Sequence, residues 1–171
     1  MPTRGLGRFR RLLLGSVTAK VLHDSSCPLL TSAHEPDPAL APASGYRSIV
    51  CAVEPNRKQD AALSAASFLA RAYGARLCLV HVESATKERS SAGSVSDAFQ
   101  RVLDADSGKG ELEASVRVHY IGVPEGIRRA AIEETADLVV VGRGHEKGAF
   151  PHLWSHLYTI IRESPCPVLS V

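Results

Sequence analysis

Three histidines near the C-terminus, His145, His152 and His156, are the residues best placed for metal chemistry. His152 and His156 stand four residues apart, one turn of a helix, and two imidazoles at that spacing can share a zinc ion with His145 as a third ligand. No cysteine or carboxylate is clearly in reach to complete the set, and histidine pairs at a solvated helix start are far commoner than zinc sites. We therefore predict no metal site and keep zinc as the alternative.

Nucleophilic side chains give little support for catalysis. The Gly-Ser-Val-Ser segment at residues 93–96 lacks the second glycine and the preceding strand of a nucleophile elbow, so a polar loop is favoured. Cys51 and Cys78 fall inside apolar runs, where cysteine behaves as a small inert hydrophobe rather than as a redox group. His81 ends another such run and is expected to be a hydrogen-bonded core imidazole. We predict that the protein is not an enzyme.

Composition and charge exclude several classes of protein. The chain has 171 residues, of which 44% are hydrophobic, 22% charged and 5% aromatic, which predicts one compact domain with a partial second element. A net charge of +2 without interleaved aromatics argues against nucleic-acid binding. Four widely spaced cysteines favour a reducing, cytoplasmic location, and no apolar run approaches the length of a membrane helix.

The first residues are basic, with Arg4, Arg8, Arg10 and Arg11 before an apolar stretch. A signal peptide is one interpretation of residues 1–22, but Lys20 interrupts the stretch and no small-x-small cleavage site follows. An amphipathic helix is favoured, with an Arg-rich exposed side. Its apolar positions keep helical spacing and are Leu13, Leu14, Val17, Val21 and Leu22.

From residue 47 onward, short apolar runs alternate with helical patterns. The expected strands are residues 48–53, 77–82, 116–120, 138–141 and 168–171, of which 116–120 alternates as an edge strand does. The expected helices are residues 58–73, 95–103, one that starts at Pro124, and 153–161 before Pro165. In the first helix Ala62, Ala66, Leu69 and Tyr73 share one stripe and Gly74 is a natural stop. Five strands alternating with four helices predict an α/β fold with a doubly wound parallel sheet.

Such sheets bind ligands at the carboxyl ends of the strands, where the strand order reverses. Two segments are expected at that edge, residues 54–56 after the first strand and the loop of residues 142–152 after the fourth.

The chain also carries an internal repeat. A shift of 139 positions gives eight identities in the 28 pairs from residue 4 to residue 31, where about two are expected by chance. The identical pairs include Arg4 with Arg143, Cys27 with Cys166 and Leu30 with Leu169. We expect residues 1–31 to be the helix and strand remnant of a preceding copy, truncated at its front, residues 32–45 a Pro- and Ala-rich linker, and residues 46–171 the complete module.

The ordered motifs of residues 46–171 resemble the universal stress protein family. They are an aliphatic strand ending in Glu54, a strand ending in His81-Val82, a Gly122-Val123-Pro124 turn, an Ala136-Asp137 pair leading into Leu-Val-Val-Val-Gly142, and the closing Pro165-Cys166-Pro167-Val168-Leu169. The resemblance implies a five-stranded, adenine nucleotide alpha hydrolase-like fold, here with an extra N-terminal helix and strand. It also implies a regulatory role in stress response.

Many members of that family bind ATP with a G-2x-G-9x-G-[ST] loop, in which glycines let backbone N–H groups approach phosphate. The resemblance implies Glu54, Val82, Gly142, Gly144 and Ser155 as the residues around a nucleotide. The loop is degenerate: Gly142 and Gly144 stand one residue apart, and Trp154 replaces the last glycine. The first copy keeps Gly5 and Gly15-Ser16 but has Pro2 where the first glycine belongs. A non-catalytic module that does not depend on ATP is therefore the main interpretation, and an ATP-binding switch with little or no hydrolysis is the alternative.

The resemblance also implies the partner. In the family the final strand commonly pairs across a two-fold interface, so we expect a homodimer, or an intramolecular pseudo-dimer in which residues 28–31 pair with residues 168–171. An enzyme of the wider fold group, such as an ATP pyrophosphatase, needs a Ser-Gly-Gly-x-Asp loop that residues 54–57 do not supply.

Overall fold

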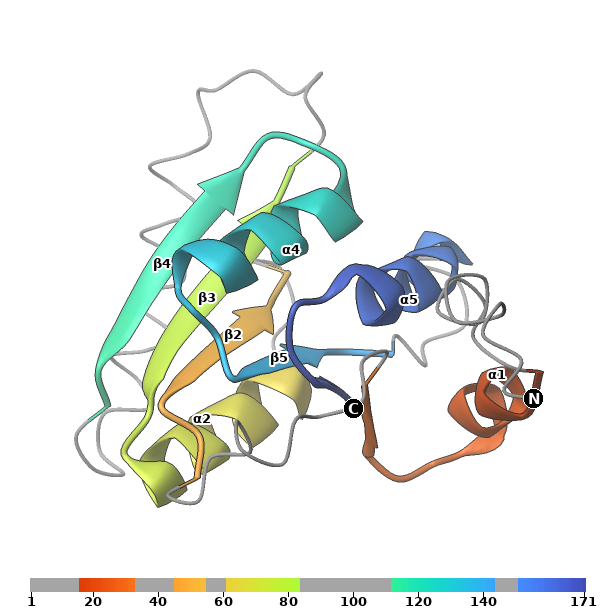
Figure 1. Cartoon of the computed structure of the whole chain (residues 1–171), viewed down its shortest axis with the longest axis horizontal. Helices are drawn as coiled ribbons and strands as arrows, with labels where there is room; N and C mark the ends of the chain where they lie inside the picture. The colour runs from red at the N-terminus through yellow and green to blue at the C-terminus, as the bar shows by residue number, and fades with distance from the viewer. Residues whose placement is uncertain (1–15, 33–44, 55–60, 84–111, 144–150) are drawn as a thin grey trace, which may run out of the picture.

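The computed structural model describes residues 16–32, 45–54, 61–83, 112–143 and 151–171, with the side chains of Ser16, Ala19 and residues 151–155 excepted. Its centre is one six-stranded sheet in the order β1-β6-β5-β2-β3-β4 (Figure 1). The strands are β1 (Leu29–Thr31), β2 (Ser48–Ala52), β3 (Arg76–Val82), β4 (Ala114–His119), β5 (Leu138–Val141) and β6 (Val168–Ser170). Strands β2 to β6 run parallel and β1 runs antiparallel to β6, so the predicted five-stranded parallel sheet with an extra strand is confirmed.

Helices cover both faces of this sheet (Figure 1). They are α1 (Ser16–Asp24), α2 (Ala61–Tyr73), α4 (Val123–Glu133) and α5 (Pro151–Glu163). Helix α2 packs its alanines on one face of the sheet, against a core that includes Ile49 and Leu79. Helices α4 and α5 pack on the other face, against Val50 and Val80. The expected helix over residues 95–103 lies outside the described residues.

The strands are buried as their composition predicts. Every residue of β5 is buried, and so are the first four of β2, because helices cover both faces there. Strand β4 is the sheet edge beside β3 and alternates in burial, as predicted. It ends at His119, one residue before the expected end at Tyr120.

Local signals set the helix ends. Gly74 adopts a φ of 63°, and the N–H of Ala75 donates to the carbonyl of Ala70 at 2.8 Å, which closes the C-terminus of α2 as predicted. The predicted stripe of α2 is wrong at Tyr73, which is 48% exposed, because its ring turns edge-on to Tyr46 instead, with centroids 5.3 Å apart.

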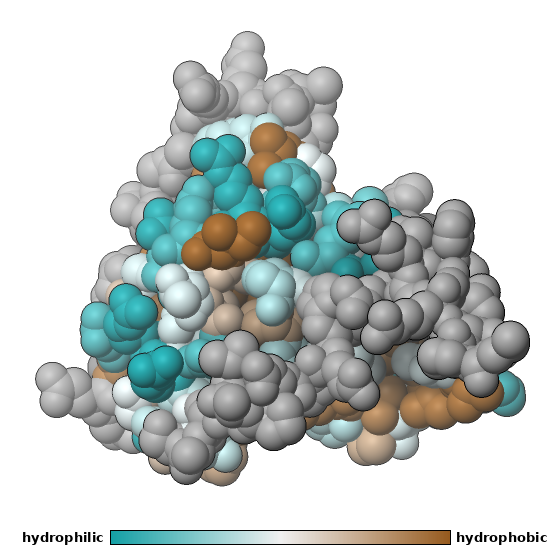
Figure 2. All heavy atoms as spheres, viewed as in Figure 1, coloured by the Kyte–Doolittle hydropathy of each residue, from teal (hydrophilic) through white to brown (hydrophobic). Residues whose placement is uncertain are grey.

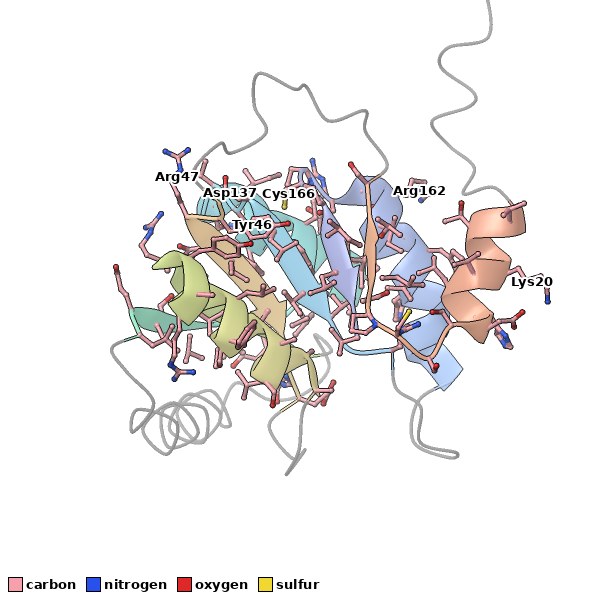
Figure 3. All side chains as sticks on the ribbon, turned by 90° about the horizontal axis from the view of Figure 1, so that it is seen from below. Lys20, Tyr46, Arg47, Asp137, Arg162 and Cys166 are labelled. Atoms are coloured by element: carbon pink, nitrogen blue, oxygen red, sulfur yellow. The ribbon has the colours of Figure 1, made fainter. Side chains whose placement is uncertain are left out.

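Asp137 ties together the amino ends of β2 and β5, with Tyr46, Arg47 and Cys166 at the same end of the sheet (Figure 3). Its Oδ2 atom accepts hydrogen bonds from the backbone N–H groups of Arg47 at 2.8 Å and Ser48 at 3.1 Å. This pairing fixes the two central strands relative to each other, so their opposite, carboxyl ends are held side by side.

Helix α1 forms as predicted, but not every residue of its predicted apolar face is buried. Leu22 is fully buried among the residues of α4 and α5, as its spacing predicts. Val17 and Val21, on the same predicted stripe, are instead 75% and 47% exposed. Ile160, the counterpart of Val21 in the repeat, is 2% exposed, so these two equivalent positions differ in burial.

Candidate functional site

A cavity opens at the carboxyl ends of the central strands, where β3 lies on one side of β2 and β5 on the other. This is the point of reversed strand order at which doubly wound sheets bind ligands. Its volume is about 50 Å³, which is smaller than the roughly 300–1,000 Å³ of typical small-molecule sites. The lining residues are Ala52, Val53, Glu54, Val80, Val82, Val123, Ile127, Val141, Gly142 and Ile160.

The structure brings three of the five expected site residues together. Glu54, Val82 and Gly142 come from the ends of three different strands and line this one cavity. Glu54 is half-buried and is the single ionisable residue among the described lining residues. Gly144 and the side chain of Ser155 lie outside the described residues, as does the side chain of Trp154.

Sequence reasoning missed the wall supplied by the helices. Val123 and Ile127 line the cavity from the start of α4, and Ile160 lines it from α5. Helix α4 begins after Gly122 with Pro124 in its first turn, so its N-terminus lies beside the cavity and favours a negatively charged group there. The Gly-Val-Pro turn was the signal that could have placed this helix end at the site.

His81 holds the strand end that carries Glu54. Its Nδ1 atom donates to the carbonyl oxygen of Val53 at 3.1 Å, and the residue is 6% exposed, which confirms the predicted hydrogen-bonded core imidazole. Its Nε2 atom lies 3.6 Å from Oε1 of Glu83, a buried carboxylate that the sequence did not single out. The hydrogen bond from His81 to Val53 therefore links the ends of β2 and β3.

Cys78 and Cys166 lie in environments that disfavour the reactive thiolate. Cys51 and Cys78 are buried, as predicted. Burial raises the pKa of the Cys78 thiol, and it raises the pKa of Cys166 to about 11. Since the thiolate is the nucleophile, Cys78 and Cys166 are protonated near neutral pH.

Two searches of the described residues bear on metals and membranes. Within these segments no group of three or more His, Cys, Asp or Glu side chains could hold a metal ion, while His145 and the side chain of His152 lie outside them. None of the described helices has the length and apolar character needed to cross a membrane.

The second feature of interest is the antiparallel pairing of β1 with β6. Leu30 lies opposite Leu169, and the pairs on either side are Leu29 with Ser170 and Thr31 with Val168. Leu30 and Leu169 are equivalent positions under the shift of 139 residues. The two flanking pairs are equivalent to each other, because Leu29 corresponds to Val168 and Thr31 corresponds to Ser170. The pairing is therefore self-complementary about its centre, as in a two-fold dimer.

Side-chain contacts follow the same symmetry. Thr31 Oγ1 donates to the carbonyl of Val168 at 3.1 Å, and its counterpart Ser170 donates to the carbonyl of Leu29 at 3.4 Å. Before each strand, a serine hydroxyl donates to the carbonyl of the cysteine two residues on: Ser25 to Cys27 at 3.4 Å, and Ser164 to Cys166 at 2.7 Å. The N-terminal segment thus repeats the local structure of the C-terminal one.

Comparison with known proteins identifies relatives with this organisation. The family model described as the universal stress protein family matches residues 1–32 and 45–171. A Thermus aquaticus protein, "Universal stress protein in QAH/OAS sulfhydrylase 3'region", is 30% identical over 139 residues, which cover 74% of this chain and 98% of that protein.

Solved structures agree. A universal stress protein from Archaeoglobus fulgidus aligns with a TM-score of 0.69 and 26% identity over 98% of this chain, which spans only 57% of that protein's length. A universal stress protein in complex with cAMP aligns over 75% of this chain and 98% of its own, with a TM-score of 0.58 and 22% identity. From the family match and the Thermus relative it follows that the chain belongs to the universal stress protein family.

Proposed function

We propose that this chain is a non-catalytic, cytoplasmic regulatory protein of the stress response whose association at the edge formed by β6 is an intramolecular pseudo-dimer. The observation that carries the proposal is the self-complementary pairing of β1 with β6. An unpaired strand edge is a template for another strand. In this chain β1 occupies that edge, so the protein carries the partner strand of a pseudo-dimer within itself.

The domain organisation is part of the proposal. Residues 1–31 are the helix and strand remnant of a preceding copy, residues 32–45 the linker and residues 46–171 the complete universal stress protein domain. Two features support this division: the family model matches two separate segments, and the hydrogen bonds around Ser25 and Ser164 are equivalent.

Weakening the docking of β1 tests the association. Leu29 packs against the core beneath α4 and α5, whereas Leu30 beside it is 58% exposed. Leu29→Asp places a carboxylate in that apolar contact and should release β1, so that the freed β6 edge drives concentration-dependent dimerisation in sedimentation velocity. Leu30→Asp is the matched control and should keep the state of the unmodified chain. A Leu29→Asp protein that sediments like the control at all concentrations would refute the proposal.

A second function is supported by the cavity: binding of an adenine mononucleotide. Glu54 would accept hydrogen bonds from ribose hydroxyls, and Val82 and Ile127 would contact the base. Gly142 would lie at the phosphate, and the family's loop pattern adds Gly144 and Ser155 to the phosphate-binding residues. The relative solved with cAMP is consistent with this ligand class. The degenerate loop with Trp154 disfavours ATP, because an indole replaces a backbone that must approach the phosphates.

Calorimetric titration with AMP tests this function. Glu54→Gln removes a charged acceptor, whose hydrogen bonds contribute about 1.5–3 kcal/mol, so AMP affinity should fall by roughly tenfold or more. Glu113→Gln changes an exposed glutamate away from the cavity and should bind AMP as the unmodified protein does. Absence of AMP binding by the unmodified chain, or equal affinity in both variants, would overturn the assignment.

A further inference from the structure

Arg143 joins the two features described above. It follows Gly142 of the cavity wall, and its side chain is 3% exposed. Its Nη1 atom donates to the carbonyl oxygen of Ser25 at 2.7 Å, and its Nη2 atom donates to that of Cys27. Both carbonyls belong to the turn between α1 and β1, so one side chain spans from the cavity wall to the docked N-terminal segment.

The backbone of Arg143 is held as firmly as its side chain. The N–H of Val171 donates to the carbonyl of Val141 at 2.9 Å, and the N–H of Arg143 donates to the carbonyl of Val171 at 2.7 Å. These bonds bracket Gly142 between β5 and the end of β6. The backbone of Arg143 is therefore fixed directly beside Gly142, which lines the cavity.

Among the described residues, no side-chain carboxylate pairs with the buried positive charge of Arg143. Within the described segments no carboxylate lies at ion-pair distance from its guanidinium, and its buried Nε atom has no hydrogen-bond partner. A buried cation is costly unless it is compensated, and two carbonyl dipoles compensate it only in part. Because the neighbouring residue Gly142 lines the cavity, the field of an anion bound there would add to this compensation.

We propose that Arg143 is a positioning residue through which docking of the α1–β1 segment and anion binding in the cavity strengthen each other. The docked segment fixes the guanidinium and, through the backbone of Arg143, the neighbouring Gly142 of the cavity wall. A nucleotide phosphate in the cavity in turn stabilises the buried charge and so the docked segment. The ligand part of this inference rests on the proposed mononucleotide binding; the mechanical part does not.

The repeat is consistent with a role at the joint between copies. Arg143 is the counterpart of Arg4, and the carbonyls that it contacts, those of Ser25 and Cys27, have Ser164 and Cys166 as counterparts. Arg4 lies outside the described residues. The identity of these two arginines is what a symmetric joint requires, since each copy contributes the same group to the other.

Hydrogen exchange of the full chain without ligand tests the mechanical part. Arg143→Met should speed exchange of the amides in residues 29–31, and Leu29→Asp should speed exchange of the Arg143 and Val171 amides, each by about fivefold or more, the lower range of couplings between sites. Arg143→Lys, which keeps the charge but not the two-pronged contact, should fall between Arg143→Met and the unmodified chain. Arg162→Met, which removes an exposed arginine paired with Glu163, is the control and should change neither group of amides.

The amide of Val53, bonded to the carbonyl of Val80 in the sheet centre, reports global opening. If Arg143→Met speeds exchange of Val53 by the same factor as that of residues 29–31, the effect is global and the coupling is refuted. The coupling is also refuted if Arg143→Met leaves exchange of residues 29–31 unchanged, or if Leu29→Asp leaves that of residue 143 unchanged.

Titration with AMP tests the ligand part. Saturating AMP should slow exchange of residues 29–31 in the unmodified chain, and Arg143→Met should weaken AMP binding, because two coupled equilibria strengthen each other in both directions. An unmodified chain that binds no AMP refutes the mononucleotide function, while the ligand-free experiment still decides the mechanical link. AMP binding that is equal in Arg143→Met and Arg162→Met, with unchanged exchange of residues 29–31, overturns the inference.

Discussion

In the proposed mononucleotide binding, Glu54 and Trp154 have opposite roles. Glu54 provides a carboxylate at the mouth, where a sugar hydroxyl can donate to it. Trp154 is the proposed obstacle to longer phosphate chains, because close approach of backbone N–H groups to phosphate requires a residue without a bulky side chain. We infer that the cavity distinguishes monophosphates from triphosphates through these two positions.

Replacing the indole tests this selectivity. Trp154→Gly should raise the affinity for ATP by about tenfold, equivalent to about 1.4 kcal/mol, and leave AMP affinity nearly unchanged. Trp154→Phe retains an aromatic ring and is the control for bulk. Because glycine within a helix costs about 1 kcal/mol relative to alanine, the melting temperature should be followed beside the calorimetry. Equal ATP affinity in the two variants would contradict the obstruction.

The sequence predicts the site residues at the strand ends better than the site residues on the helices. Glu54, Val82 and Gly142 could be predicted because parallel strands end at a common edge, whatever the side chains on the helices. Val123, Ile127 and Ile160 could not, since their approach to the mouth depends on how α4 and α5 cross the sheet. That crossing is decided by packing between distant residues, which periodicity does not report.

Among the elements, α4 sets the width of the cavity through its contact with β3. Gly126 is the point of closest approach: a Cβ atom there would lie 2.6 Å from Cγ2 of Val82 and 3.1 Å from its Cγ1. Val82 lines the cavity and has a stiff, β-branched side chain, so it cannot move aside without cost. Glycine is therefore required in the helix despite its poor helix propensity.

Gly126→Ala should lower the free energy of unfolding in urea. Overpacking costs about 1–3 kcal/mol, which exceeds the gain of up to about 1 kcal/mol in helix propensity. Gly122→Ala is the matched control, because a Cβ atom there would meet nothing within 4 Å. An alanine at residue 126 that leaves stability equal to or above that of the unmodified protein would show that α4 can shift outward freely.

Element types follow from the sequence wherever burial on both faces produces continuous apolar runs, as in β2, β3 and β5. Helix α1 shows where this reasoning ends. The spacing of Val17, Val21 and Leu22 indicates an apolar face, yet Val17 and Val21 are exposed. Periodicity identifies a face that can be buried, but what covers the face depends on the rest of the module.

For the whole molecule, the sheet has two kinds of edge. Strand β4 ends it on one side, and on the other β6 is covered by β1. Apolar residues of the α1–β1 segment remain exposed beyond this joint, at Val17, Val21 and Leu30, and apolar surface is visible over α1 (Figure 2). The α1–β1 segment thus covers the β6 edge of the sheet, while apolar side chains of that segment remain exposed.

The molar mass of residues 46–171, measured by light scattering beside that of the full chain, tests the central claim most directly. The relative solved with cAMP corresponds to 75% of this chain and 98% of its own length, so a single module of this kind folds. Without residues 1–45 the β6 edge and the surface under Leu22 and Leu29 are uncovered, and an open edge recruits another strand. We predict a monomeric full chain and a dimeric or aggregating module; a module that stays monomeric and well folded at all concentrations would contradict the account.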